Sequence, residues 1–199
     1  DIIDVTQSAI EITSGVFAAE GISSGRAPSS GRISGGGHND DWGCRPSISG
    51  SFDLMKNQDS LVYSGTFTID YGDGSSCNST RVRKGKITDT FKYVVVFGDD
   101  SISYSSTEAI TFEGFTKEST QVDGTFIIAS SSGNPKTVEA QNAKITYPDG
   151  TSVQWSGILS FAYDRGERCK WKDNTISVTG SISGVNREGV AFTVEIINP

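Results

Sequence analysis

The chain is 199 residues long, which suits a single all-β domain with a core of its own. Its formal net charge of −7 argues against a nucleic-acid partner, because nucleic-acid binding draws its affinity from Lys and Arg side chains that neutralise phosphates. No stretch approaches the roughly 20 apolar residues that a membrane-spanning helix needs. The 23 Gly residues, with abundant Ser and Thr, favour short strands joined by many turns.

The first 43 residues differ in composition from the rest of the chain. Residues 1 to about 20 place apolar side chains at helical spacing, which predicts a short helix. Residues 21–43 are rich in Gly, Ser and Arg and bury too little apolar surface to offset the entropy of ordering. We therefore expect residues 1–43 to form a helical segment and a Ser/Gly-rich connector, and residues 44–199 to form an all-β domain.

After Cys44 the apolar residues alternate with polar ones, as in strands with one buried face. Such runs cover residues 61–71, 87–97, 110–112, 125–129, 138–147, 153–163, 175–182 and 190–196. They are separated by turn signals at residues 72–74, 98–100, 123–124, 133–135, 149–150 and 187–189. Asp-Gly pairs recur in these signals, and both residues tolerate the positive φ that tight hairpin turns need.

Roughly nine or ten strands result, most of them linked to the next by a short turn, as in a meander. A wide twisted sheet becomes unfavourable beyond about ten strands, so a series of this length curls or folds into two layers. The predicted fold is all-β, an antiparallel meander that forms a β-sandwich or an extended curled sheet, with a short N-terminal helical segment.

Three segments in this order carry a resemblance to a known family. They are Cys44-Arg-Pro, then Ile69-Asp-Tyr-Gly-Asp-Gly with Cys77, then Arg81 and Arg83 before Gly85-Lys-Ile. The order and spacing resemble a group of predicted Bacteroidetes lipoproteins, in which a CP-x-V/I segment, an IDFG-x-GC turn and an RSGKI strand follow one another. The likeness covers most of residues 44–197.

The resemblance implies an exported protein of the cell envelope, in the periplasm or at the outer-membrane surface. It also implies a lipid anchor on a cysteine upstream of Asp1, as the sole contact with the membrane, and no recognised catalytic residue set. Export and the position of two cysteines beside early strands predict a disulfide between Cys44 and Cys77. The extra Cys169 leaves open which cysteine stays free.

Catalytic groups are few. His38, the sole histidine, lies in the Gly-rich connector, which provides no rigid support for a nucleophile and base. Hydrolysis by two carboxylates needs a pair that faces a sugar at about 5 to 10 Å, and sequence does not show facing. The carboxylate candidates are Asp89, Glu108, Glu113, Asp164 and Glu195. We predict no enzymatic activity and no cofactor.

Two binding chemistries remain. The loop aromatics Trp42 and Trp171, with Tyr71 near the first Asp-Gly turn, are candidates for a glycan-binding platform. Asp70 and Asp73 offer oxygen ligands to Ca²⁺, but the loop lacks the ligand spacing of an EF-hand, and Asp side chains in turns commonly bond to nearby backbone.

We therefore predict a monomeric, non-enzymatic binding or structural module, with an envelope protein or a glycan as its partner. The alternatives are a glycan-binding or glycan-processing accessory protein and a calcium-stabilised adhesin.

Overall fold

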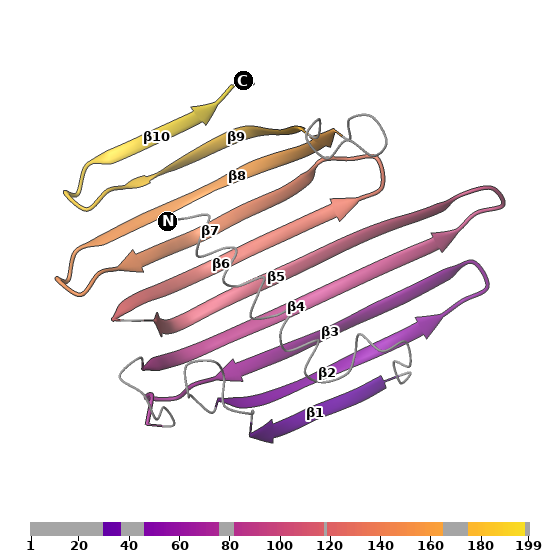
Figure 1. The fold of residues 1–199 in the computed structure, drawn as a ribbon, viewed down its shortest axis with the longest axis horizontal. Helices are drawn as coiled ribbons and strands as arrows, with labels where there is room; N and C mark the ends of the chain where they lie inside the picture. Colours follow the sequence, from indigo (N-terminus) through magenta and orange to yellow (C-terminus); the bar gives the residue numbers. More distant parts are fainter. Residues whose placement is uncertain (1–29, 37–45, 76–81, 118, 165–174, 198–199) are drawn as a thin grey trace.

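The computed structural model describes residues 30–36, 46–75, 82–117, 119–164 and 175–197, and these form a single antiparallel sheet. Ten described strands follow one another across the sheet in chain order, so the topology is a meander (Figure 1). The strands are β1 (Ser30–Gly36), β2 (Ser47–Lys56), β3 (Ser60–Asp70), β4 (Arg83–Phe97), β5 (Ile102–Lys117), β6 (Thr120–Ser131), β7 (Lys136–Thr146), β8 (Ser152–Asp164), β9 (Thr175–Val185) and β10 (Ala191–Ile196).

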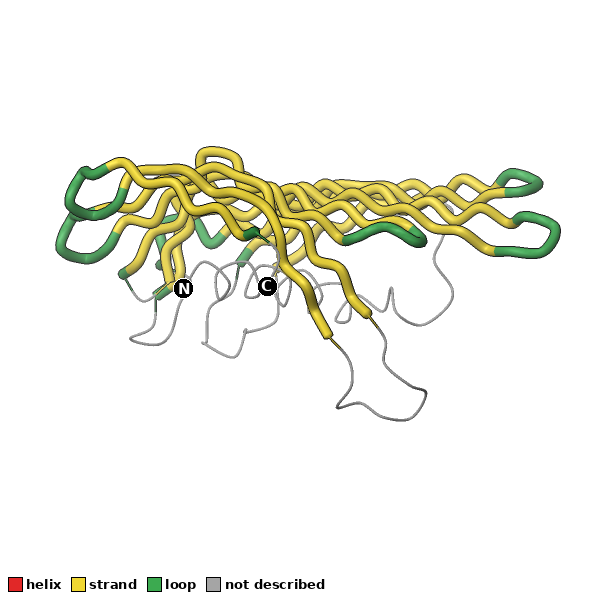
Figure 2. Tube along the Cα trace, turned by 90° about the horizontal axis from the view of Figure 1, so that it is seen from above, coloured by secondary structure: helices red, strands yellow, loops and turns green. Residues whose placement is uncertain are grey.

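The all-β prediction is confirmed, and the extended curled sheet is the form that the described strands take. Seen from above, they make one layer that bends at one side and does not fold back on itself (Figure 2). Strands β1 and β10 are the two edges of this sheet. None of the described residues forms a helix long and apolar enough to span a membrane.

The alternation of the sequence gives the sheet two chemically different faces. The core face carries the buried side chains, of which Trp155, Phe91, Phe126, Ile87 and Ile110 are among the largest that are fully buried. One buried cluster extends from β3 to β8, and a second joins Phe52, Phe67 and Phe91 on β2, β3 and β4. The opposite face is polar in most strands, because its residues alternate with those of the core.

Strand β1 is a difference from the sequence analysis, which places its residues in the connector. Residues 30–36 pair antiparallel with residues 47–53 of β2. Small Gly and Ser residues provide no apolar alternation, so the pattern that identifies the other strands is missing here, and backbone pairing forms the strand. The predicted helical segment lies outside the described residues.

Asp123-Gly124 is a second difference, because it lies inside β6 and not in a turn. The register between β6 and β7 shifts between Asp123 and Thr125, and Gly124 has a φ of 114°. Asp123 also stabilises a register shift in β5, between Phe112 and Phe115. There, Asp123 Oδ1 accepts a hydrogen bond from the Gly114 backbone nitrogen at 2.6 Å. The Asp-Gly pair is thus a β-bulge, which uses the same positive φ as a tight turn.

Candidate functional site

Of the three residues predicted to bind a ligand, Tyr71 alone is among the described residues. Trp42 and Trp171 are outside the described residues, as are His38 and the cysteines Cys44, Cys77 and Cys169. Tyr71 belongs to the core, with 4% of its surface exposed, and its hydroxyl accepts a hydrogen bond from Arg83 Nη1 at 3.1 Å. The Arg83 guanidinium also lies 5.7 Å from the centre of the Tyr71 ring. This environment assigns Tyr71 a packing role, and we do not include its ring in a ligand platform.

The two weak calcium candidates cap their own turn. Asp70 Oδ1 accepts a hydrogen bond from the Gly72 backbone nitrogen at 2.8 Å, and Asp73 Oδ1 accepts one from Ser75 at 2.9 Å. The hydrogen bonds from Ser75 lower the pKa of Asp73. In the described part of the chain, no three His, Cys, Asp or Glu side chains gather as a possible metal site.

Of the five carboxylate candidates, the fold brings Asp89 and Glu108 together on the core face. Asp89 on β4 is opposite Ile110 of β5, and Glu108 is opposite the next core-face residue, Phe91. Asp89 is only 2% exposed. Glu113 instead forms an ion pair with Lys86 at 2.5 Å, and Glu195 is exposed on β10; Asp164 ends β8.

Burial controls the protonation of this pair. It is the largest cause that raises the pKa of Asp89 to about 7, and the charge of Glu108 and a hydrogen bond with it add to the rise. Burial also raises the pKa of Glu108. Two ionised carboxylates can only accept hydrogen bonds, and both oxygens of Asp89 are then buried without a partner among the described residues. Below a pH of about 7, protonated Asp89 can donate a hydrogen bond to Glu108, and the pair then holds at most one negative charge in place of two.

The polar side of the sheet carries a regular grid, which we call the hydroxyl face. It consists of two adjacent rows, each one residue wide, that cross β2 to β6. The rows are Ser49, Thr68, Thr88, Thr111, Thr125 and Ser51, Thr66, Thr90, Ala109, Ile127. The threonine hydroxyls meet across strands, at 3.1 Å for Thr66 and Thr90 and 3.0 Å for Thr111 and Thr125. No position of the two rows carries a charge, although 21% of the residues of the chain are charged.

Both rows of the hydroxyl face lead into an open hollow of about 540 Å³ over β7, β8 and β9. Its lining residues are Glu139, Ala140, Gln141, Asn142, Ser156, Gly157, Ile158 and Ser181. Thr125 is opposite Gln141, and Ile127 is opposite Glu139, which is followed across the sheet by Ile158 and Ser181. The two uncharged rows therefore end in a hollow whose polar side chains are one carboxylate, two amides and two hydroxyls.

A bulge in β7 shapes the hollow. The register of β7 and β8 shifts between Ala140 and Ala143, and Asn142 in this step has a φ of 50°, which Asn tolerates better than most residues. The backbone nitrogen of Asn142 donates to Ser156 Oγ at 2.9 Å, and Gln141 Nε2 donates to Glu139 Oε1 at 2.8 Å. These bonds fix the polar groups at the rim, while 47% of the surface of Ile158 stays exposed. Apolar surface with a few fixed polar groups is typical of small-ligand sites.

Sequence reasoning does not identify the hollow, because its residues come from three strands and a bulge sets their positions. Their only sequence signal is the interruption of alternation at Gln141-Asn142.

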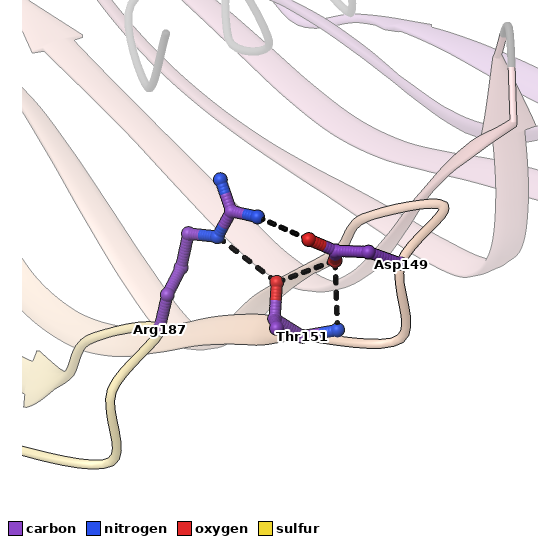
Figure 3. A network of polar contacts seen from close by, with 3 residues as sticks. All are labelled: Asp149, Thr151 and Arg187. Atoms are coloured by element: carbon purple, nitrogen blue, oxygen red, sulfur yellow. Dashed lines mark hydrogen bonds and ion pairs between the residues drawn. The ribbon is translucent and has the colours of Figure 1, made fainter.

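A separate polar network joins the turns after β7 and β9 (Figure 3). Asp149 Oδ2 accepts a hydrogen bond from Arg187 Nη2 at 2.6 Å, and Asp149 Oδ1 accepts one from the Thr151 hydroxyl at 2.6 Å. Arg187 Nε donates to that hydroxyl at 2.9 Å, and the guanidinium lies 4.3 Å from the centre of the Tyr147 ring. Every group in the network has a partner within it, so we interpret it as a structural link between the turns.

This network predicts how the pKa of Asp149 responds to substitution. Hydrogen bonds from Thr151 are the largest cause of its lowered pKa, and Arg187 contributes less. We expect Thr151→Val to raise the pKa of Asp149 more than Arg187→Ala does, as measured by NMR titration of the carboxyl carbon. Because the pKa of the folded state is lowered, the stability that Asp149 contributes is lost as the pH falls through that value. An unchanged pKa in Thr151→Val would show that the hydroxyl does not hold the carboxylate.

Comparison with known proteins adds no relative: no protein-family model matches the chain, and no curated protein or solved structure shows significant similarity to it.

Proposed function

We propose that the chain is a non-enzymatic binding module of the cell envelope, and that its ligand is a glycan held in the hollow of the hydroxyl face. The observation that carries this proposal is the composition of the hollow. Amide, carboxylate and hydroxyl groups surround an exposed apolar side chain, Ile158, and continue an uncharged grid of hydroxyls. Sugars present hydroxyl groups beside apolar C–H patches, so this mixture suits them better than a charged ligand.

The extended shape of the surface favours a chain of sugars over a single one. The two rows cross five strands before they reach the hollow. Neighbouring strands lie about 4.8 Å apart, so the grid spans roughly 20 Å, enough for several linked sugars. We place the strongest contacts in the hollow and weaker ones along the threonine rows.

A binding role fits the placement of the carboxylates. Glycoside hydrolysis by the common mechanism needs two carboxyl groups on either side of one bound sugar. Glu139 is the sole carboxylate among the described residues that line the hollow, and the Asp89–Glu108 pair belongs to the opposite face. Neither arrangement provides two carboxylates at one open site.

The cell-envelope location rests on the resemblance of residues 44–197 to Bacteroidetes lipoproteins. The proposal includes export and a lipid anchor upstream of Asp1. Mass spectrometry of the protein isolated from its native membranes tests the anchor, because a diacylglyceryl group on an N-terminal cysteine has a defined mass. A soluble, unmodified N-terminus would contradict it.

The binding site is tested with the variant Ser181→Phe. Ser181 is exposed at the edge of the hollow, so a phenyl ring there fills the space without disturbing the core. On a glycan array, we expect the wild type to bind a subset of polysaccharides and Ser181→Phe to bind them about tenfold more weakly.

The matched control is Ser105→Phe, which makes the same change at an exposed position on β5, near the tip of the β4–β5 hairpin. It should leave binding unchanged. Equal loss in both variants, or no binding of any glycan by the wild type, would contradict the proposal. Release of reducing sugar from a bound polysaccharide would contradict its non-enzymatic part.

A further inference from the structure

One of the two rows of the hydroxyl face continues through the hollow and reaches β10. From Thr125 on β6 it passes to Gln141 on β7, and across the bulge to Ser156 on β8. Ser156 is opposite Ser183 on β9, and Ser183 is opposite Thr193 on β10. We call this the long row, and its members are Ser49, Thr68, Thr88, Thr111, Thr125, Gln141, Ser156, Ser183 and Thr193.

The long row is polar and uncharged from β2 to β10. Every position holds Ser or Thr except the one on β7, which holds Gln. None of these side chains is fully buried, and those of Ser49, Gln141, Ser183 and Thr193 are exposed. Each position therefore offers a hydroxyl or an amide to a ligand that both donates and accepts hydrogen bonds.

Charged side chains limit the uncharged path along a strand but not across the strands. On β4, the polar face is uncharged at Thr88 and Thr90, and lysines flank these two at positions 86 and 92. Lys86 forms its ion pair with Glu113 of β5 beside the long row. A neutral polymer therefore has a continuous path across the strands, whereas a path along β4 soon meets a lysine.

The repeat of the long row matches that of one class of polymer. Neighbouring strands lie about 4.8 Å apart, which is close to the length of one sugar unit in an extended β-1,4-linked chain. Such a chain keeps step with the strands, one sugar to each strand, and the row from β2 to β10 spans roughly 38 Å. Figure 1 shows these strands side by side across the sheet. An α-1,4-linked chain coils, so it leaves the row after a few sugars.

We propose that the ligand of the hydroxyl face is a neutral, extended β-1,4-linked glycan that lies across the strands along the long row. This inference rests on the proposed glycan function and adds the linkage, direction and length of the ligand. Sugars in the hollow lie over β7, β8 and β9, and the next ones lie over Thr125, Thr111 and Thr88. The glycan is neutral because Glu139, the charged residue that lines the hollow, repels an acidic sugar.

Chain length and linkage test this inference on the full chain. Isothermal titration calorimetry compares dimers and hexamers of β-1,4-linked glucose, mannose, xylose and N-acetylglucosamine with those of α-1,4-linked glucose. In at least one β-1,4-linked series, we expect the hexamer to bind about tenfold more tightly than the dimer, because it adds contacts along the row.

Three results would overturn the inference and leave the hollow as a glycan site. The first is equal affinity for dimer and hexamer in every β-1,4-linked series that binds. The second is tighter binding of the α-1,4-linked hexamer. The third is a glycan-array ligand of another linkage when no β-1,4-linked hexamer binds. Failure of the proposed function itself is different, because the array then shows no ligand at all.

Two substitutions on β5 locate the long row. Thr111→Phe places a ring on the row, two strands from β7, and should weaken hexamer binding about tenfold while dimer binding in the hollow is unchanged. Thr107→Phe makes the same change on the same strand and face, at an exposed position outside the row, and should leave both affinities unchanged. Equal weakening of hexamer binding by both variants would contradict the inference.

Retained dimer binding shows that Thr111→Phe is folded. A milder variant, Thr111→Val, keeps the shape of the side chain and removes its hydroxyl. It should weaken hexamer binding about threefold, because one hydrogen bond to the sugar is lost. Unchanged hexamer binding in both Thr111 variants would show that the ligand does not follow the long row.

Discussion

The wild-type protein should become easier to unfold with urea as the pH rises from about 4 to about 8, by an amount on the order of 3 to 4 kcal/mol. The cause is Asp89, whose pKa burial raises to about 7 in the folded state. In the unfolded chain the same group has an ordinary pKa near 3.9. The folded protein therefore holds this proton more tightly than the unfolded chain does.

The direction of the pH dependence of stability follows from this difference in pKa between the folded and unfolded states. Below pH 4 both states carry the proton, and the contribution of Asp89 to stability is fully present. Between pH 4 and pH 7 the unfolded chain releases its proton while the folded protein keeps it, so the free energy of unfolding falls. Above pH 7 the fold must hold a buried carboxylate next to Glu108, and the contribution has been lost.

The variant Asp89→Asn separates this group from all others. It should match the wild type near pH 4 and exceed its stability at pH 8, because the amide stays neutral. The titratable groups that interact with Asp89 are Glu108 on β5 and Tyr93 on β4. Tyr63 on β3 acts on Tyr93, and Lys136 on β7 acts on Glu108. Glu108→Gln removes the neighbouring charge, so the fall in the free energy of unfolding should occur at lower pH. A stability difference between wild type and Asp89→Asn that does not vary with pH would contradict this account.

Trp155→Ala should lower the free energy of unfolding by about 3 to 5 kcal/mol. Trp155 is 1% exposed, and its ring centre lies 6.4 Å from that of Phe126 on β6. On the neighbouring strand, a Cβ atom at Gly184 would come within 2.9 Å of the Trp155 Cβ, so the two strands pack closely there. Removing the indole leaves a cavity that this tight backbone cannot fill by collapse.

The control for this substitution is Tyr163→Ala, at the end of the same strand and on the same face. Tyr163 is 55% exposed, so its loss should cost less than about 1 kcal/mol. Chemical unfolding monitored by circular dichroism measures both values. Equal losses would show that the core does not centre on Trp155.

The strands were the most predictable part of the structure. Apolar alternation at residues 61–71 and 87–97 corresponds to β3 and β4, and the Asp-Gly pair at residues 149–150 forms the expected turn. Alternation of apolar and polar residues indicates which side chains are buried, so it identifies strands that have one buried face. Strand β1 escapes this reasoning because its Gly and Ser residues pair through the backbone.

Features set by register were not predictable. Asp89 and Glu108 are 19 positions apart, and the sequence contains both as carboxylates in alternating strands. Their meeting depends on how β4 and β5 align, in an unbroken register from Lys86 opposite Glu113 to Phe97 opposite Ile102. The hollow depends in the same way on the bulge at Asn142. A one-residue slip in either place would send these side chains to the other face.

The most direct test of the glycan proposal is an NMR titration of the ¹⁵N-labelled protein with the polysaccharide fragment that binds best on the array. We expect the largest amide shifts at residues 139–142, 156–158 and 181, with smaller shifts along Thr88 and Thr111 of the hydroxyl face. Ser181→Phe should abolish this pattern while the rest of the spectrum is preserved. Shifts that cluster around Tyr63, Tyr93 and Glu108 instead would place the ligand on the core face and contradict the proposed site.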